Sequence, residues 1–286
     1  MGDYIMNAIQ TSNGSNLGLS HMGKIQKFAH NKKTIYSSDR EVLAVYANEQ
    51  SERFLELSLS KKILSNIEVL WNYDTYLFFT NISQKIKDLC FKCDEIEKFE
   101  REQKENVVIL RQVLPNEKAN YSRNLQEIIS EVSLFLEKNN IDDANDLLIN
   151  GKISEDYIYY FKNNVWFEIF VYAIFTKLDQ RENRVIFRCD INGKSGTRHQ
   201  VDTAIIAPMY TAIIEAKSKA FKKQEYMDLI GKKADINADI AILISGEPNP
   251  HDNVNSDKFR NVFVFCDMFS GEFSSILNQI KGIFPS

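Results

Sequence analysis

A carboxylate and a lysine close an apolar stretch in the second half of the chain. The segment Tyr210-Thr-Ala-Ile-Ile-Glu215-Ala-Lys217 carries the pair, and Asp202 lies upstream of it in another apolar run. Successive side chains of a strand point to opposite faces, so Glu215 and Lys217 would share a face and Ala216 would point away. Carboxylates are hard oxygen ligands for Mg²⁺ or Mn²⁺, which can hold a phosphate group and activate a water molecule. The spacing therefore predicts metal-assisted hydrolysis of a phosphodiester.

Lys217 would act on the water in such a site. A divalent ion and burial both lower the pKa of an ammonium group, so this lysine could orient or deprotonate the nucleophile. The alternative is an ion pair with Glu215 on a solvated sheet face, which would contribute little to stability. Because the pair ends an almost wholly apolar segment, its position favours the catalytic interpretation.

A third carboxylate, Glu168, lies within the nearly all-round apolar segment 165–175. Such a segment is a buried helix or a membrane piece, and its length falls short of a bilayer span. An isolated charge inside a buried helix is costly unless it is paired, protonated or bound to a metal. Two interpretations stay open: a third acid of the metal site, or a structural partner for a nearby arginine or lysine.

The segments around these residues predict an α/β fold. Apolar and β-branched runs predict strands at residues 184–191, 200–206, 211–214, 239–244 and 261–266. The turn residues Ala207-Pro-Met209 would join the second and third of these strands, and Asn192-Gly193 would form a hairpin before the second. Residues 269–284 predict a closing helix. The expected architecture is a mixed sheet flanked by helices.

This order of acids and strands resembles the PD-(D/E)XK nuclease superfamily. Within it, Trp166-Phe-Glu168-Ile-Phe-Val-Tyr172, Gln200-Val-Asp202 and Ile214-Glu215-Ala-Lys217 are most similar to the nuclease domain of certain CRISPR-associated proteins, which couple a cyclic-oligonucleotide sensor to a nuclease. The match covers roughly the C-terminal half of the chain. Val201 precedes Asp202, where the name of the superfamily has a proline.

The resemblance implies a restriction-endonuclease-like fold and a metal-dependent endonuclease that cuts DNA or RNA, in anti-phage or other nucleic-acid defence. By the same resemblance, the site consists of the metal-site acids Glu168, Asp202 and Glu215, the Ala216 carbonyl as a further ligand for Mg²⁺ or Mn²⁺, and Lys217 as the catalytic lysine. A polar residue of the helix after the motif can add a contact, and Gln224 is the nearest candidate. The alternative is a non-catalytic module that binds nucleic acid or protein on the same fold.

The net charge of −4 argues against binding nucleic acid through bulk electrostatics alone. Basic residues nevertheless gather around the motif: Arg198, His199, Lys217, Lys219, Lys222, Lys223, Lys232 and Lys233. They would follow a phosphate backbone, or Lys219, Lys222 and Lys223 would form the solvated face of an amphipathic helix. A lone histidine in a polar hairpin, such as His199, is more often a surface residue than a general base.

Residues 24–150 predict a mainly helical domain with a role in assembly or regulation. No glycine occurs between Gly23 and Gly151, and Pro115 is the only proline there, so turn signals are scarce. A long charge-dense helix is expected over residues 82–111, and apolar residues recur at helical spacing over 125–136. These features suit packing against a second copy of the chain or a partner protein. No glycine-loop pattern of a nucleotide sensor is visible.

The sequence thus divides into a mobile tail at residues 1–23, the helical domain at 24–150 and a nuclease-like domain at 151–286. No apolar run is long enough to span a bilayer, and no secretory signal pattern opens the sequence. Cys90 and Cys93 lack a second cysteine pair or a histidine cluster that would complete a zinc site. The expected compartment is a reducing cytoplasm.

Overall fold

The structure is a computed structural model that describes residues 26–30, 33–37, 42–47, 49–102, 107–139, 148–149, 152–178, 185–207, 210–249, 251, 256–257 and 260–284. The strands are β1 (Gln26–His30), β2 (Lys33–Ser37), β3 (Val42–Ala47), β4 (Leu148–Ile149), β5 (Lys152–Ile153), β6 (Val185–Asn192), β7 (Arg198–Ile206), β8 (Thr211–Lys217), β9 (Ile240–Ser245) and β10 (Val262–Phe265). The helices are α2 (Glu49–Glu56), α3 (Ser58–Leu70), α4 (Tyr73–Glu102), α5 (Val107–Lys138), α6 (Glu155–Lys162), α7 (Val165–Leu178), α8 (Lys223–Ile236) and α9 (Phe273–Lys281). The tail predicted for residues 1–23 lies outside the described residues.

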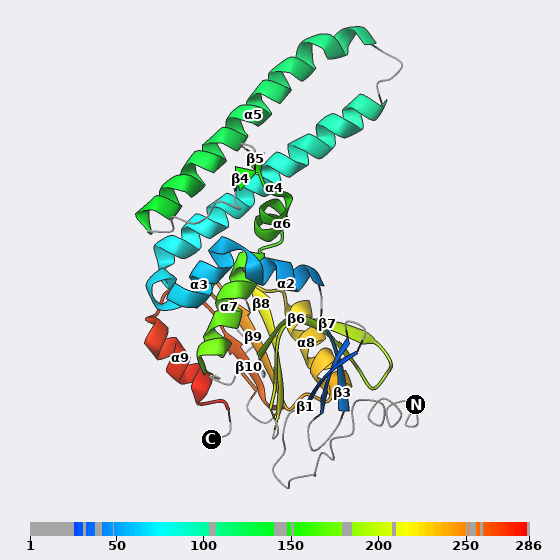
Figure 1. Ribbon diagram of the computed structural model, residues 1–286, viewed down its shortest axis with the longest axis vertical. Coiled ribbons are helices and arrows are strands. Elements are labelled where there is room, and N and C mark those ends of the chain that lie inside the picture. The colour runs from blue at the N-terminus through cyan, green and yellow to red at the C-terminus, as the bar shows by residue number, and fades with distance from the viewer. Residues whose placement is uncertain are drawn as a thin grey trace.

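The main sheet is mixed and has eight strands in the order β1-β2-β3-β6-β7-β8-β9-β10. Neighbouring strands are antiparallel from β1 to β8, whereas β8, β9 and β10 run parallel to one another. Helices cover both faces of this sheet, and a mainly helical region precedes β6 (Figure 1). The predicted α/β class, a mixed sheet flanked by helices, is confirmed.

The helical expectation is wrong for residues 26–30, 33–37 and 42–47, which form β1, β2 and β3. These strands make an antiparallel meander, and β3 extends the main sheet by pairing Val45 with Ile191 of β6. The scarcity of glycine and proline hid them, because missing turn signals do not by themselves favour a helix. The β-branched and aromatic residues of Val42-Leu-Ala-Val-Tyr-Ala47 fit a strand better.

Two hydrophobic clusters lie on opposite faces of the sheet. On one face, α7 packs over strand residues that include Phe187, Ile205 and Ile214. On the other, α8 packs over residues that include Cys189 and Ile213. Because strand side chains alternate between faces, Ile213 and Ile214 fall into different clusters as expected.

The alternation is broken at Arg188 in β6. Phe187 joins the cluster under α7 while Cys189 joins the cluster under α8, although residues two apart normally share a face. Arg188 itself has a φ of 39°, a left-handed conformation that is uncommon for a residue with a Cβ. The local turn of the backbone brings a buried arginine to the place where β6 faces Asp202 of β7.

The two halves of the chain share one of these clusters. Trp166 of α7 stacks on Phe79 of α4 with a centroid distance of 5.1 Å, and its indole nitrogen donates to Ser83 at 2.9 Å. The same cluster includes buried residues of α3 and α5, such as Ile63 and Ile128. The first half therefore supplies part of the core of the second.

Helices α4 and α5 form a long antiparallel hairpin that projects from this core (Figure 1). The single helix expected over residues 82–111 is instead divided between them, since α4 ends at Glu102 and α5 begins at Val107. Of the helices in the described parts of the chain, none is both long and apolar enough to cross a membrane.

A fragment that begins at Ser154 tests whether the second half folds alone. It would lack α3, α4 and α5, and would expose the surface of α7 that carries Trp166 and Phe170. Each large aromatic side chain left in water forfeits about 2–3 kcal/mol of hydrophobic stabilisation. We expect the fragment to show no cooperative transition in urea when followed by circular dichroism, with the full chain as the control. A sharp transition at the full-length midpoint would contradict this expectation.

Candidate functional site

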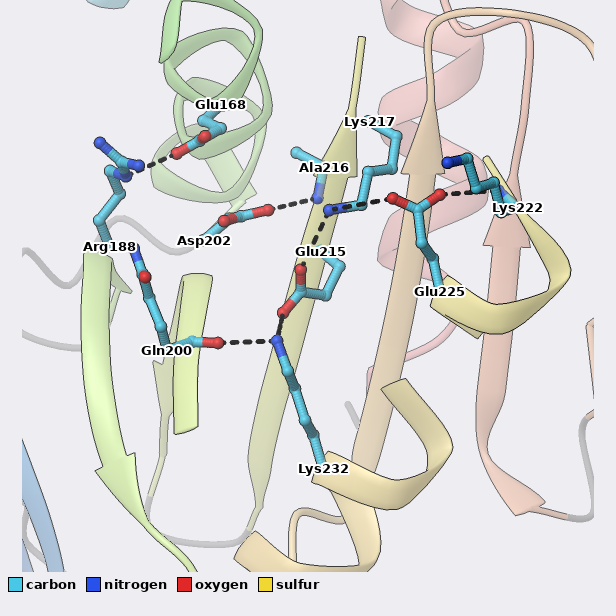
Figure 2. A network of polar contacts seen from close by, with 10 residues as sticks. All are labelled: Glu168, Arg188, Gln200, Asp202, Glu215, Ala216, Lys217, Lys222, Glu225 and Lys232. Atoms are coloured by element: carbon cyan, nitrogen blue, oxygen red, sulfur yellow. Dashed lines mark hydrogen bonds and ion pairs between the residues drawn. The ribbon is translucent and has the colours of Figure 1, made fainter. Parts of the chain in front are cut away.

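The candidate site lies where β7 and β8 part. Backbone pairing between these strands ends at Thr203 and Ile214. One residue further on, the Asp202 carboxylate replaces the missing backbone partner and accepts a hydrogen bond from the Ala216 amide at 2.8 Å (Figure 2). The side chain thereby fills the gap between the strands and is held in one orientation.

Glu215 lies beside this gap and is almost completely buried, with 7% of its surface exposed. One carboxylate oxygen, Oε1, accepts a hydrogen bond from the Lys232 ammonium at 2.6 Å. The other, Oε2, lies 3.5 Å from the Lys217 ammonium (Figure 2). Each oxygen of this buried carboxylate thus has a lysine as its partner, one from α8 and one from its own strand.

Lys217 stands among three carboxylates. Burial alone would lower the pKa of its ammonium group, but the charges of these carboxylates, Asp202, Glu215 and Glu225, together with that of Glu168, outweigh burial and raise that pKa. Glu225, at the start of α8, approaches the ammonium to 3.9 Å. The side chain is therefore a stable cation in this arrangement, which suits it to orient an anion or a water molecule and not to accept a proton.

The Asp202 carboxyl group is held in an unfavourable environment for its charge. Burial, and then the negative charge of Glu215, raise its pKa to about 6, while Lys217 and the Ala216 amide act in the opposite direction. Carboxyl groups with raised pKa values cluster at functional sites. The third acid behaves in the same way, because burial and then Asp202 raise the pKa of Glu168.

Glu168 pairs with Arg188. The Oε2 atom of Glu168 and the Nε atom of Arg188 lie 2.9 Å apart, and both side chains are about nine-tenths buried. The two groups are not aligned as a hydrogen bond, and neither atom has a hydrogen-bonding partner among the described residues. Glu168 is therefore a partner of an arginine, as the structural interpretation predicts. It also lies close enough to Asp202 for the charge of that acid to raise its pKa.

Helix α2 holds Arg188 from the other side. The Ser51 hydroxyl donates to the Arg188 carbonyl at 3.0 Å, and the guanidinium group lies 5.6 Å from the centre of the Phe54 ring. A cation over an aromatic face is stabilised by the ring quadrupole. No sequence pattern indicates Arg188, because its role depends on a left-handed backbone conformation that arises in the assembled sheet.

The substrate-binding candidates lie at the rim of the site. Lys219, Lys222, Lys223 and Gln224 are all exposed. Gln224 donates to Asp228 of its own helix at 2.7 Å, which is an ordinary contact of a solvated helix face. Lys219 differs from the others, because its ammonium donates to the side-chain oxygen of Gln84 on α4 at 3.4 Å.

Two basic residues of the β6–β7 hairpin have local partners. Arg198 pairs with Asp190 across the hairpin at 2.6 Å. His199 contacts Asp235 of α8 at 2.6 Å, and the Ser195 hydroxyl donates to the same carboxylate at 2.6 Å. Gly193 leaves room for this carboxylate, since a Cβ on this residue would lie 1.9 Å from Asp235 Oδ2 and would force the side chain to move. These contacts fasten the hairpin to α8 and give His199 a structural partner.

Lys232 and Glu225 complete the polar network. Lys232 is expected from the sequence among the basic residues around the motif but not as a partner of Glu215, and Glu225 is not expected in the site. Lys232 lies between Leu229 and Ile236, at the three- and four-residue spacing that marks one face of a helix, and both of these neighbours are buried. The position of Lys232 on the buried face of an amphipathic helix could have identified this lysine as a residue of the site. Glu225 accepts a hydrogen bond from the Lys222 backbone amide at 2.7 Å at the start of α8, a contact that no capping-box pattern in the sequence indicated.

The oxygen donors fit a hard divalent cation in type. Asp202, Glu215 and the Ala216 carbonyl are ligands that Mg²⁺ and Mn²⁺ accept, and Glu168 Oε2 is a buried oxygen without a hydrogen-bonding partner in the described structure. Among the described residues, no three acidic, histidine or cysteine side chains converge as a ready ligand set. Lys217, Lys232 and Arg188 instead neutralise the carboxylates in this conformation.

Comparison with known proteins does not assign the chain to a family. No protein-family model matches it. None of the curated proteins compared with it matches either. Among solved structures, protein VC1899 from Vibrio cholerae is similar over 85% of this chain and 60% of that one, with a TM-score of 0.48 and 15% identity. Can2 from Sulfobacillus thermosulfidooxidans, in complex with cyclic tetra-adenylate, is similar over 52% of this chain and 45% of that one, with a TM-score of 0.37 and 16% identity.

The chain therefore spans less than two thirds of either solved structure. Both TM-scores are below 0.5, so neither likeness identifies what this chain does.

The buried pair predicts a large and non-additive effect on stability. We expect Arg188→Met to lower the free energy of unfolding by about 3–5 kcal/mol, because it leaves the Glu168 charge without a partner. Adding Glu168→Gln should restore part of the loss, so urea denaturation of the single and double variants should reveal coupling. Arg198→Met is the matched control, since its more exposed pair with Asp190 should be worth about 0–1 kcal/mol. Equal losses in the two arginine variants would contradict this.

The raised pKa of Asp202 predicts a specific pH dependence without metal. Its folded pKa is about 6 and its ordinary value is 3.8, so this group makes the protein less stable as the pH rises between those values. Asp202→Asn keeps an oxygen for the Ala216 amide and removes the charge. In chelator, we expect it to melt a few degrees above the wild type at pH 7.5, with a smaller advantage at pH 4. An advantage that is equal at both pH values would argue against this cause.

Proposed function

We propose that this protein is a metal-dependent nuclease that hydrolyses phosphodiester bonds in DNA or RNA. The observation that carries the proposal is the group of Asp202, Glu215 and Lys217 at the point where β7 and β8 part. Asp202 is fixed there by the Ala216 amide, and Glu215 by two ammonium groups. This combination provides oxygen ligands for a metal ion and a cation for a phosphate within one small region.

The free-energy cost of burying these charged groups supports a functional role for them. Taking charged groups out of water destabilises a fold, and apolar residues of similar size would often serve the core better. Burial raises the pKa values of Asp202 and Glu168, and the neighbouring acids, Glu215 for Asp202 and Asp202 for Glu168, raise them further. Such strained electrostatics are expected where a cation or a reacting group is to be bound.

Each residue then has a definite task. Asp202, Glu215 and the Ala216 carbonyl would hold the ion, and Glu168 would contribute a further negative charge. A bound Mg²⁺ or Mn²⁺ would supply a Lewis acid for the phosphate and lower the pKa of water. The Ala216 amide keeps Asp202 in one rotamer. Lys217, which keeps its proton in this setting, would orient the attacking water or the scissile phosphate.

The surroundings of Lys219 favour a nucleic-acid substrate. Burial, and then the charge of Lys219, lower the pKa of Lys87 on α4, so the two ammonium groups act on one another. Lys87 is held by the Asn164 side chain at 3.1 Å, and Gln84 contacts Lys219. A phosphate of the substrate backbone would relieve the repulsion between the two lysines. The first half of the chain would thereby contribute to binding without providing a catalytic group.

The alternative is a non-catalytic module that binds nucleic acid or protein through the same sheet. It requires no divalent ion and would leave Asp202 and Glu215 as remnants of a scaffold. The complete set of acids and lysine favours the nuclease. A role in defence against foreign nucleic acid, and pairing with a second copy that would present two sites to a duplex, remain predictions from the sequence.

Cleavage assays test the nuclease directly. Purified protein is incubated with single- and double-stranded DNA and RNA, with Mg²⁺, with Mn²⁺ or with chelator. We expect cleavage only with metal, and a loss of at least about 100-fold in Asp202→Ala and in Glu215→Ala, because each removes a ligand. Asp228→Ala, an exposed acid on α8, is the control. Binding of nucleic acid without cleavage under every metal condition would favour the non-catalytic module.

Lys217→Ala separates catalysis from metal binding. Its ammonium is proposed to act on water or phosphate and not on the ion, so we expect a much lower rate with an unchanged or higher affinity for Mn²⁺ in calorimetry. A matching loss of Mn²⁺ affinity would show that the role assigned to this lysine is wrong.

A further inference from the structure

A second lysine of the site is placed where a cation would be needed. The Lys232 ammonium donates to Glu215 Oε1 at 2.6 Å and to the Gln200 carbonyl at 2.8 Å (Figure 2). Its side chain is 27% exposed, so most of it is enclosed by protein. Both hydrogen bonds cross from α8 to the sheet, and each joins the ammonium to an oxygen beside the gap between β7 and β8.

The position of Lys232 is fixed from both ends of its helix. Leu229 and Ile236, on the same face of α8, are buried in the cluster beneath the helix. One turn beyond Lys232, Asp235 is fastened to the β6–β7 hairpin through Ser195 and His199. The helix therefore cannot rotate this lysine away from the sheet, and release of Glu215 requires movement of the side chain alone.

We propose that Lys232 is a resident counter-ion of Glu215, and that it competes with the divalent cation for Oε1. This inference rests on the proposed function, because it assumes that Glu215 is a metal ligand. A protonated ammonium has no lone pair and cannot become a ligand itself. Glu215 Oε1, as a ligand of a divalent cation, would face two positive charges at once, because the Lys232 ammonium already donates to this oxygen. Lys232 would therefore have to withdraw from Oε1 for Glu215 to hold the ion.

The two lysines of Glu215 have different roles in this view. Lys217 lies 3.5 Å from Oε2 and is shared with Glu225, so its contact with Glu215 is the looser one. Lys232 makes the short contact and has a second acceptor in Gln200, which keeps it in place while no metal is present. The opposite role, in which Lys232 holds Glu215 ready for the ion, predicts an effect of opposite sign on metal affinity.

Calorimetric titration of the full chain with Mn²⁺ alone distinguishes the two roles. We expect Lys232→Met to bind Mn²⁺ about tenfold more tightly than the wild type, because a charge-assisted hydrogen bond no longer has to be broken. Lys232→Arg keeps the positive charge and should stay close to the wild type. Lys281→Met, at an exposed lysine in the last turn of α9, is the control and should also leave the affinity unchanged.

Each result has a definite meaning. Tighter binding in Lys232→Met, or binding in this variant when the wild type shows none, supports the competition. Unchanged or weaker binding in Lys232→Met, when the wild type binds Mn²⁺, overturns it and leaves the nuclease proposal intact. Absence of Mn²⁺ binding in both proteins overturns the metal site itself and this inference with it. Circular dichroism checks the fold, and Lys232→Gln replaces Lys232→Met if the latter is unfolded.

Discussion

Negative charge is enclosed between two apolar layers of this protein, and several elements of the fold supply the cations that offset it. The acids gather around the point where β7 and β8 part, and water cannot fully solvate them there, so each needs a cation nearby. Each cation fixes the position of the element that carries it, because losing the contact would leave a buried carboxylate unpaired. The acids are Glu168, Asp202 and Glu215, and their partners are Arg188 from β6, Lys217 from β8 and Lys232 from α8.

The first half of the chain supports this arrangement at two places. Helix α2 holds Arg188 through Ser51 and the Phe54 ring. Helix α4 holds the chain just beyond Lys217, since the Tyr76 hydroxyl donates to the Ser218 carbonyl at 2.7 Å. Burial, and then the charge of Glu247, raise the pKa of Tyr76 to about 12, so the phenol keeps the proton that this bond requires. Residues distant in sequence therefore position the site although they carry none of its acids.

The parts of the molecule that can be predicted from the sequence are those determined by the spacing of apolar and polar residues within one helix or strand. The two strands around Ala207, the buried helix α7 and the contact between Glu215 and Lys217 follow from side-chain alternation and apolar runs. Arg188 could not be predicted, because its left-handed backbone reverses the alternation of β6 and arises from tertiary packing. The contact between Lys232 and Glu215 could not be predicted for a related reason, because lysines usually lie on the solvated face of a helix. The strands β1 to β3 escape prediction because sparse turn signals do not distinguish a strand from a helix.

Both tryptophans of the chain lie in the core that the two halves share. Trp71 stacks on Phe269 with a centroid distance of 4.3 Å, and Trp166 stacks on Phe79. Their fluorescence therefore reports on the junction between the helices and the sheet. When this junction opens and both indoles enter water, their emission maxima should shift to longer wavelengths together. Events confined to the outer part of the α4–α5 hairpin or to the meander β1–β3 leave these indoles buried. A fluorophore attached elsewhere is needed to follow those regions.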